Sequence, residues 1–150
     1  MTAALAAWKA RGRSRTLCGH RIFTLDLAAS GRETAPPLLV LHGFPTSSFD
    51  FHRVVDSLAV QRRVVLFDML GYGRSAKPDH HYRLADQADI AQQLLAELGI
   101  ARFGMLTHDV GDTVGGELLA RQLEGSWDVE VTDRVPVSYT HLTLPTNREV

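Results

Sequence analysis

The sequence has little cysteine, no long apolar run and almost no net charge. Cys18 is the only cysteine among 150 residues, which excludes an internal disulfide and predicts a reducing, cytoplasmic location. No apolar run approaches the ~18 residues that a membrane-spanning helix needs, so we expect no membrane partner. Sixteen Lys and Arg residues against seventeen Asp and Glu residues give a net charge of −1. The chain therefore has no overall basic field for binding nucleic acid.

The C-terminal segment 137–150 reads VSYTHLTLPTNREV. Read back through plausible codons, its first five residues can be GTC-TCT-TAT-ACA-CAT, which resembles a transposase end sequence used in sequencing-library adapters. We therefore expect residues 137–150 to be adapter read-through and residues 1–136 to be the native polypeptide. A genuine β-rich tail is the alternative interpretation.

Short apolar runs alternate with helix-like segments through the rest of the chain. Strands are expected at 15–18, 21–27, 38–41, 64–67, 103–107 and 129–135, and helices at 49–58, 84–98 and 112–123. Two of the runs, LLVL at 38–41 and VVLF at 64–67, are apolar throughout, as in strands buried on both faces. This alternation predicts an α/β fold with a mostly parallel sheet flanked by helices.

The first candidate site lies between an expected strand and an expected helix, at residues 107–111 (THDVG). The pattern of a small residue, any residue, a nucleophile, any residue and glycine is typical of a sharp turn that raises the middle side chain above the sheet. That side chain is Asp109, and a carboxylate is a competent nucleophile at neutral pH without a base to activate it. Alternatively, Asp109 only caps the helix, and Asp112 could fill the same capping role.

The second candidate site is the turn His42-Gly43-Phe44-Pro45, which follows an apolar strand. A turn with glycine at a strand end can direct a backbone N–H into a cleft. Together with the N–H of Val110, the N–H of Phe44 would form an oxyanion hole. An ordinary strand-to-helix turn punctuated by proline is the alternative.

Three segments, LVLHGFPTSS at 39–48, LFDMLGYGRSAKP at 66–78 and HDVGD at 108–112, resemble the N-terminal half of the α/β-hydrolase family. Within it, the resemblance is to the aspartate-nucleophile subgroup of epoxide hydrolases, haloalkane dehalogenases and mesoderm-specific-transcript-like proteins. It covers roughly residues 15–135 and implies an α/β-hydrolase core truncated after the helix that follows the nucleophile.

The resemblance assigns roles to individual residues. It implies that Asp109 is the catalytic nucleophile and that the amides of Phe44 and Val110 form the oxyanion hole. The residues that support these two motifs are His42, Gly43, Pro45, His108 and Gly111. It also implies a small-molecule substrate and no cofactor or metal.

Departures from the family pattern bear on the substrate. Dehalogenases usually carry Trp where this chain has Val110, and Asn or Glu where it has Phe44. Phe44 suits epoxide hydrolases, although these too commonly carry Trp at the position of Val110. Epoxide opening is therefore the preferred reaction. A haloalkane dehalogenase and a non-catalytic binding protein of the same fold remain the alternatives.

The catalytic acid and the base histidine follow the nucleophile in this fold, and both are expected beyond Pro136. Without that base, an ester on Asp109 would form but would not be hydrolysed efficiently, so the chain by itself is expected to be inactive. The adjacent His80 and His81 are expected to be solvated rather than to bind a metal. Cys18 is expected to be a small core residue in a strand.

Overall fold

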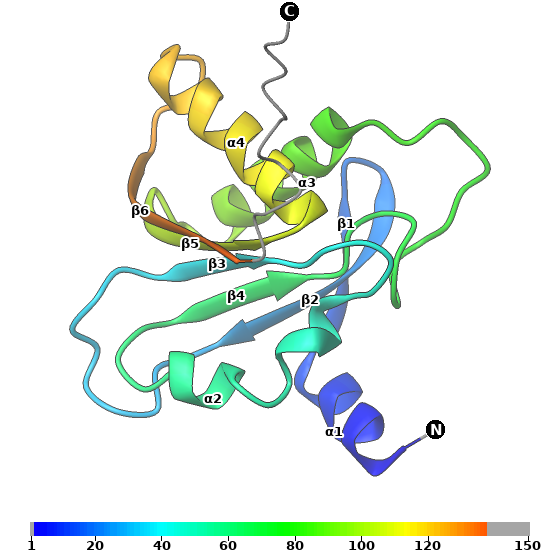
Figure 1. Ribbon diagram of the computed structural model, residues 1–150, viewed down its shortest axis with the longest axis vertical. Coiled ribbons are helices and arrows are strands. Elements are labelled where there is room, and N and C mark those ends of the chain that lie inside the picture. Colours follow the sequence, from blue (N-terminus) through cyan, green and yellow to red (C-terminus); the bar gives the residue numbers. More distant parts are fainter. Residues whose placement is uncertain (1, 138–150) are drawn as a thin grey trace, which may run out of the picture.

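The computed structural model describes residues 2–137, which form a six-stranded sheet in the order β1-β2-β4-β3-β5-β6 (Figure 1). The strands are β1 (Arg13–Leu17), β2 (His20–Leu27), β3 (Leu38–Leu41), β4 (Val64–Phe67), β5 (Arg102–His108) and β6 (Glu130–Val137). β1 pairs antiparallel with β2, and β2 pairs antiparallel with β4. The other pairs, β4 with β3, β3 with β5 and β5 with β6, are parallel. The expected α/β fold with a mostly parallel sheet is confirmed.

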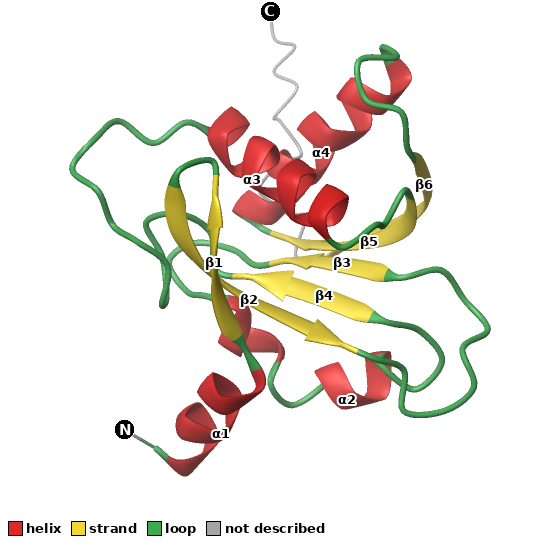
Figure 2. Cartoon of the chain, turned by 180° about the vertical axis from the view of Figure 1, so that it is seen from behind, coloured by secondary structure: helices red, strands yellow, loops and turns green. Residues whose placement is uncertain are grey.

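Helices cover both faces of this sheet. They are α1 (Ala3–Arg11), the 3-10 helix η1 (Ser48–Phe51), α2 (Val55–Leu58), α3 (Leu84–Glu97) and α4 (Val110–Leu123). Figures 1 and 2 show α3 and α4 on one side of the sheet and α1 and α2 on the other. Each apolar strand serves both cores: Leu39 and Leu41 of β3 pack on the α3 and α4 side, and Leu38 and Val40 on the opposite side. This double burial explains why β3 and β4 are apolar throughout.

The strand connections change direction at the carboxyl end of β3. From β3 the chain passes through α2 to β4 on one side, and from β4 it passes through α3 to β5 on the other side of β3. Connections that leave in opposite directions separate at the strand ends, and ligands bind at such points in open α/β sheets. The loops that begin at His42 and at Asp109 both lie there, after β3 and β5 respectively.

Some local expectations are wrong. The segment expected to be one helix at 49–58 is two short helices, η1 and α2. The first ends at Phe51, where the N–H of His52 donates to the carbonyl oxygen of Phe49 at 3.0 Å. Cys18 is exposed and lies in the β1–β2 turn, so it is neither in a strand nor in the core. Its φ of 48° and the 78° of Gly19 are the positive values that a two-residue hairpin turn requires at both central positions.

The helix α1 was not anticipated. Only Trp8 of this helix is buried, so its other apolar residues, mostly alanines, mark no core face. Of the segment expected to be adapter read-through, Val137 is the last residue of β6 and residues 138–150 lie outside the described part of the chain. Within residues 2–137, no helix is long and apolar enough to cross a membrane.

Candidate active site

Asp109 stands at a sharp turn between the buried strand β5 and the helix α4. Its φ of 55° and ψ of −117° are rare for a residue with a side chain, and strain of this kind is concentrated at functional sites. The turn packs against the end of β3: a Cβ added at Gly111 would lie 2.6 Å from the carbonyl oxygens of Leu41 and His42. Only glycine therefore allows this close approach.

Two backbone amides converge on one carboxylate oxygen of Asp109. The N–H of Val110 donates to Oδ1 at 2.7 Å, and the N–H of Phe44 donates to the same atom at 3.0 Å. The bond from Val110 makes Asp109 the N-cap of α4, a role that Asp112 does not fill. The bond from Phe44 comes from a loop 65 residues away in the sequence, which helix capping alone does not require. The two turns singled out in the sequence therefore form one site.

Gly43 allows the two turns to meet. A Cβ added at this position would lie 2.8 Å from Nδ1 of His108 and 3.1 Å from its carbonyl oxygen. The glycine in each motif thus serves the same end, because each removes the atom that would separate β3 from β5 at this edge. The next peptide bond, between Phe44 and Pro45, is cis.

His42, buried directly after β3, supports the site and is held in its neutral form. The residue is only 1% exposed. Nε2 accepts the N–H of Met69 at 2.9 Å, so the ring proton is on Nδ1, which lies 2.9 Å from the carbonyl oxygen of Gly43. Burial lowers the pKa of the imidazole below its usual 6.5. With both ring nitrogens engaged by backbone, His42 orients the loop and is poorly placed to accept a substrate proton.

Asp68 ties the loops after β3 and β4 together. It is buried: Oδ1 accepts the N–H of Ser48 at 2.9 Å, and Oδ2 accepts the N–H of Arg74 at 2.7 Å. Sequence reasoning assigned no role to Asp68. Its position directly after a buried strand was the available signal, because a charge there needs partners from neighbouring loops.

Asp112, in the first turn of α4, supports the strained turn from the side of the helix that faces the sheet. Its carboxylate is 3% exposed, accepts the hydroxyl of Thr107 at 2.8 Å and pairs with Arg134 on β6. Arg134 also donates to the backbone carbonyl of Asp112 at 2.8 Å. The network joins β5, α4 and β6 around Asp109. Neither the Thr107–Asp112 bond nor the Arg134 pair was anticipated from the sequence.

Two aromatic side chains belong to the loops after β3 and β4. Phe44 is 63% exposed, and its ring centroid lies 6.3 Å from that of Tyr72, which packs against His42 on its other side. Val110 is half-buried and has no side-chain donor. The site therefore offers a carboxylate and two backbone amides, without a side-chain N–H from position 110.

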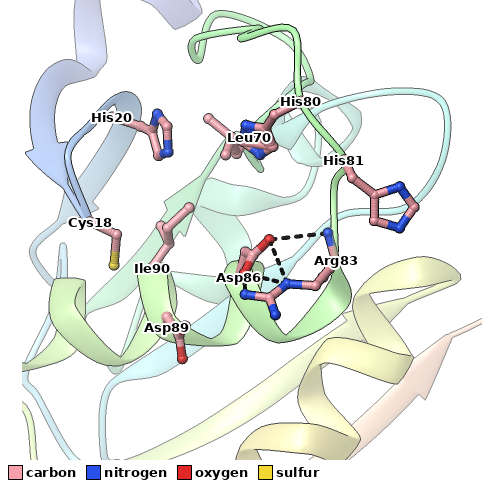
Figure 3. A pocket seen from close by; sticks show the side chains of 9 residues that line it. All are labelled: Cys18, His20, Leu70, His80, His81, Arg83, Asp86, Asp89 and Ile90. Atoms are coloured by element: carbon pink, nitrogen blue, oxygen red, sulfur yellow. Dashed lines mark hydrogen bonds and ion pairs between the residues drawn. The ribbon is translucent and has the colours of Figure 1, made fainter.

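The adjacent His80 and His81 line a separate cavity of about 310 Å³. Figure 3 shows Cys18 and His20 on one side of it and His81 and Arg83 on the other. His20 faces His80 with ring centroids 5.6 Å apart, and both His80 and His81 are exposed. Within residues 2–137, no group of three or more His, Cys, Asp or Glu side chains could hold a metal ion.

Comparisons with known proteins agree with this architecture. A sequence model described as "alpha/beta hydrolase fold" matches residues 36–124. The mesoderm-specific transcript homolog protein of Bos taurus is 44% identical over 126 residues, which cover 81% of this chain and 37% of that protein. The chain thus spans little more than a third of the length of this relative.

Solved structures show the same likeness. The haloalkane dehalogenase DbeA of Bradyrhizobium elkani superposes with a TM-score of 0.71 at 33% identity, over 83% of this chain and 40% of that one. The epoxide hydrolase CorEH superposes with a TM-score of 0.70 at 26% identity, over 83% and 41%. The family match over residues 36–124, together with the mostly parallel sheet and the sharp turn at Asp109, shows that the chain belongs to the α/β-hydrolase fold family.

Proposed function

We propose that this chain is the nucleophile-bearing part of a cofactor-free hydrolase that opens epoxides through a covalent ester on Asp109. The observation that carries the proposal is the convergence of the Phe44 and Val110 amides on Asp109 Oδ1. Two donors aimed at one point form an oxyanion hole. A nucleophilic carboxylate needs one of its own oxygens at that point when the ester is later hydrolysed.

In the first half-reaction, Asp109 Oδ2 attacks an epoxide carbon and the carbon–oxygen bond of the ring breaks. A new ester bond joins Oδ2 to the substrate, and the released alkoxide takes a proton from water to become a hydroxyl. The amides on Oδ1 hold the carboxylate in one orientation, and the N-terminus of α4 favours its negative charge. The exposed face of Phe44 supplies apolar contact for the substrate.

In the second half-reaction, water attacks Cγ of Asp109 after losing a proton to a base. Negative charge then develops on Oδ1, where the amides of Phe44 and Val110 stabilise it. The ester bond to Oδ2 breaks, and the departing oxygen takes the proton held by the base, so the diol leaves. Asp109 then loses its proton to the hydroxide left by the first half-reaction and is a carboxylate again. His42 is unsuited to be that base because both ring nitrogens are engaged by backbone. We place the base histidine and its acid partner outside residues 1–136, so this chain alone forms the ester but turns over poorly.

Haloalkane dehalogenation is the second candidate, because a structure that the chain resembles at 33% identity is a haloalkane dehalogenase. The same attack would then expel a halide. Val110 argues against it, since its side chain has no N–H to hold a leaving halide. The substrate in either case is a small molecule. We place the protein in the cytoplasm, where the exposed thiol of Cys18 would remain reduced.

Mass spectrometry of the intact chain incubated with styrene oxide tests the proposal. Because hydrolysis lacks its base, a stable adduct of one substrate mass should accumulate on the peptide that contains Asp109. Asp109→Asn should lose the adduct, because an amide is a poor nucleophile. Asp79→Asn, which changes an exposed carboxylate outside the site, is the matched control and should retain it.

The outcomes separate the candidates. An adduct on Asp109 from a bromoalkane with release of bromide, and none from the epoxide, would favour dehalogenation. Equal labelling of the Asp109→Asn variant would show that another group reacts. A folded chain that labels with neither probe would contradict the nucleophile and leave Asp109 as a helix cap.

A further inference from the structure

A basic cavity lies on the face of the sheet that carries α1, and its chemistry is unrelated to Asp109. Its volume is about 210 Å³. The residues that surround it are Lys9, Arg13, Ser14, Arg21, Phe23 and Arg74, with the backbone of Gly12. Four of these side chains are cationic and none is acidic, although the whole chain has a net charge of −1.

The positive charge is concentrated at the start of the chain. The first 30 residues contain five Lys and Arg residues, namely Lys9, Arg11, Arg13, Arg15 and Arg21, against the single acid Asp26. In the part of the chain that the structure describes, Arg11 and Arg15 form ion pairs with carboxylates, whereas Lys9, Arg13, Arg21 and Arg74 form none. The N-terminal cations without a carboxylate are therefore the ones that meet Arg74 at this cavity.

The cavity is held in place by buried structure. Phe23 is 3% exposed and packs so closely on Gly12 that an added Cβ would lie 2.3 Å from its ring. The guanidinium of Arg74 lies over the same ring, 5.7 Å from its centroid. The backbone of Arg74 is fixed twice, because its N–H donates to the buried Asp68 and its carbonyl accepts Nη1 of Arg21 at 2.8 Å.

Several like charges around one hollow repel one another unless an anion lies between them. Guanidinium groups match the oxygens of phosphate by paired N–H bonds, and the hydroxyl of Ser14 adds a neutral donor. We propose that this cavity binds a phosphate group, carried either by a small phosphorylated molecule or by a lipid headgroup. Arg13, Arg21 and Arg74 bind the oxygens, and Lys9 adds charge at the rim.

Isothermal titration calorimetry of the 150-residue chain with inorganic phosphate at low ionic strength tests the site. Saturable binding of one phosphate per chain is expected, and Arg74→Gln should weaken it about tenfold, as the loss of a charge-assisted hydrogen bond does. Because Arg74 also packs on Phe23, Arg13→Gln is the second variant. Its side chain makes no hydrogen bond or ion pair within residues 2–137, so the fold should survive while binding weakens.

Arg32→Gln, an exposed arginine in the loop before β3, is the charge-matched control and should change binding less than about twofold. Co-sedimentation with phosphatidic acid vesicles, compared with phosphatidylcholine vesicles, separates the two sources. Binding to the acidic vesicles that Arg13→Gln weakens would identify a headgroup, and binding in solution alone would identify a small molecule. An absence of binding in both assays, or an equal loss in Arg32→Gln, would overturn the proposal.

Discussion

Gly43 and Asp109 approach so closely that a Cβ built on Gly43 would lie 2.5 Å from the Cβ of Asp109. The two residues lie in loops that follow β3 and β5, adjacent parallel strands. The missing side chain at position 43 therefore sets the distance between the Phe44 amide and the carboxylate of Asp109. Because this contact depends only on the absence of a side chain at Gly43, a methyl group added there tests it.

Gly43→Ala should separate the two loops and remove the Phe44 hydrogen bond to Asp109. We expect a loss of unfolding free energy of about 1–3 kcal/mol from overpacking, together with loss of the epoxide adduct. Chemical denaturation and mass spectrometry measure the two effects. Gly116→Ala is the control: a Cβ there meets nothing within 4 Å, and alanine should stabilise α4 by about 0.5–1 kcal/mol. A Gly43→Ala variant that labels like the parent would contradict the argument.

The Asp112–Arg134 pair should contribute strongly to stability. Arg134→Gln leaves the buried carboxylate of Asp112 with a weaker partner, and breaking such a pair costs roughly 3 kcal/mol. Arg102→Gln is a matched control, because Arg102 and Glu130 also join β5 to β6 but are both well exposed. That variant should lose less than about 1 kcal/mol.

A double variant refines this test. Asp112→Asn combined with Arg134→Gln removes both charges, so its loss of unfolding free energy should be smaller than the two single losses added together. Additive losses, or equal effects of Arg134→Gln and Arg102→Gln, would show that the buried pair contributes no more than a surface pair.

The sequence predicted the apolar part of the fold well. The bounds of β3 and β4 agree with the expected 38–41 and 64–67, because strands buried on both faces are apolar at every position. The turns at His42 and Asp109 were recognised from local patterns. Their convergence in space is now described, while the roles of Phe44, Asp109 and Val110 in catalysis stay predictions.

The polar supports could not be predicted in this way. Arg134 pairs with Asp112 across 22 residues, and Ser48 bonds Asp68 across 20. Such bonds depend on which strands become neighbours, and no local spacing encodes that. Cys18 was predicted to lie in a strand for a related reason. The positive φ that places it in the β1–β2 turn arises from the twist of two paired strands, which the local sequence does not show.

His42 should make stability depend on pH. Burial lowers its pKa, so the imidazole takes up a proton near pH 6.5 in the unfolded chain but only at a lower pH in the folded chain. The stability that the neutral, buried imidazole contributes is therefore present in full above pH 6.5 and is lost as the pH falls toward the lower folded pKa. His42→Gln should show a smaller loss of Tm between about pH 7.5 and pH 5.5 than the parent. His81→Gln, an exposed control, should follow the parent. Parallel Tm curves for all three proteins would contradict a neutral, buried imidazole.

Deleting residues 138–150 should leave stability unchanged. The segment follows Val137, the last residue of β6, and its sequence resembles translated adapter rather than a native tail. If the segment is not native, the unfolding free energy should stay within about 0.5 kcal/mol. Deleting residues 130–150 is the positive control, because it removes β6 and with it the Arg134 partner of Asp112. That chain should unfold at a clearly lower denaturant concentration. If removing 138–150 alone costs more than about 1 kcal/mol, the segment packs on the fold and its interpretation as adapter read-through is wrong.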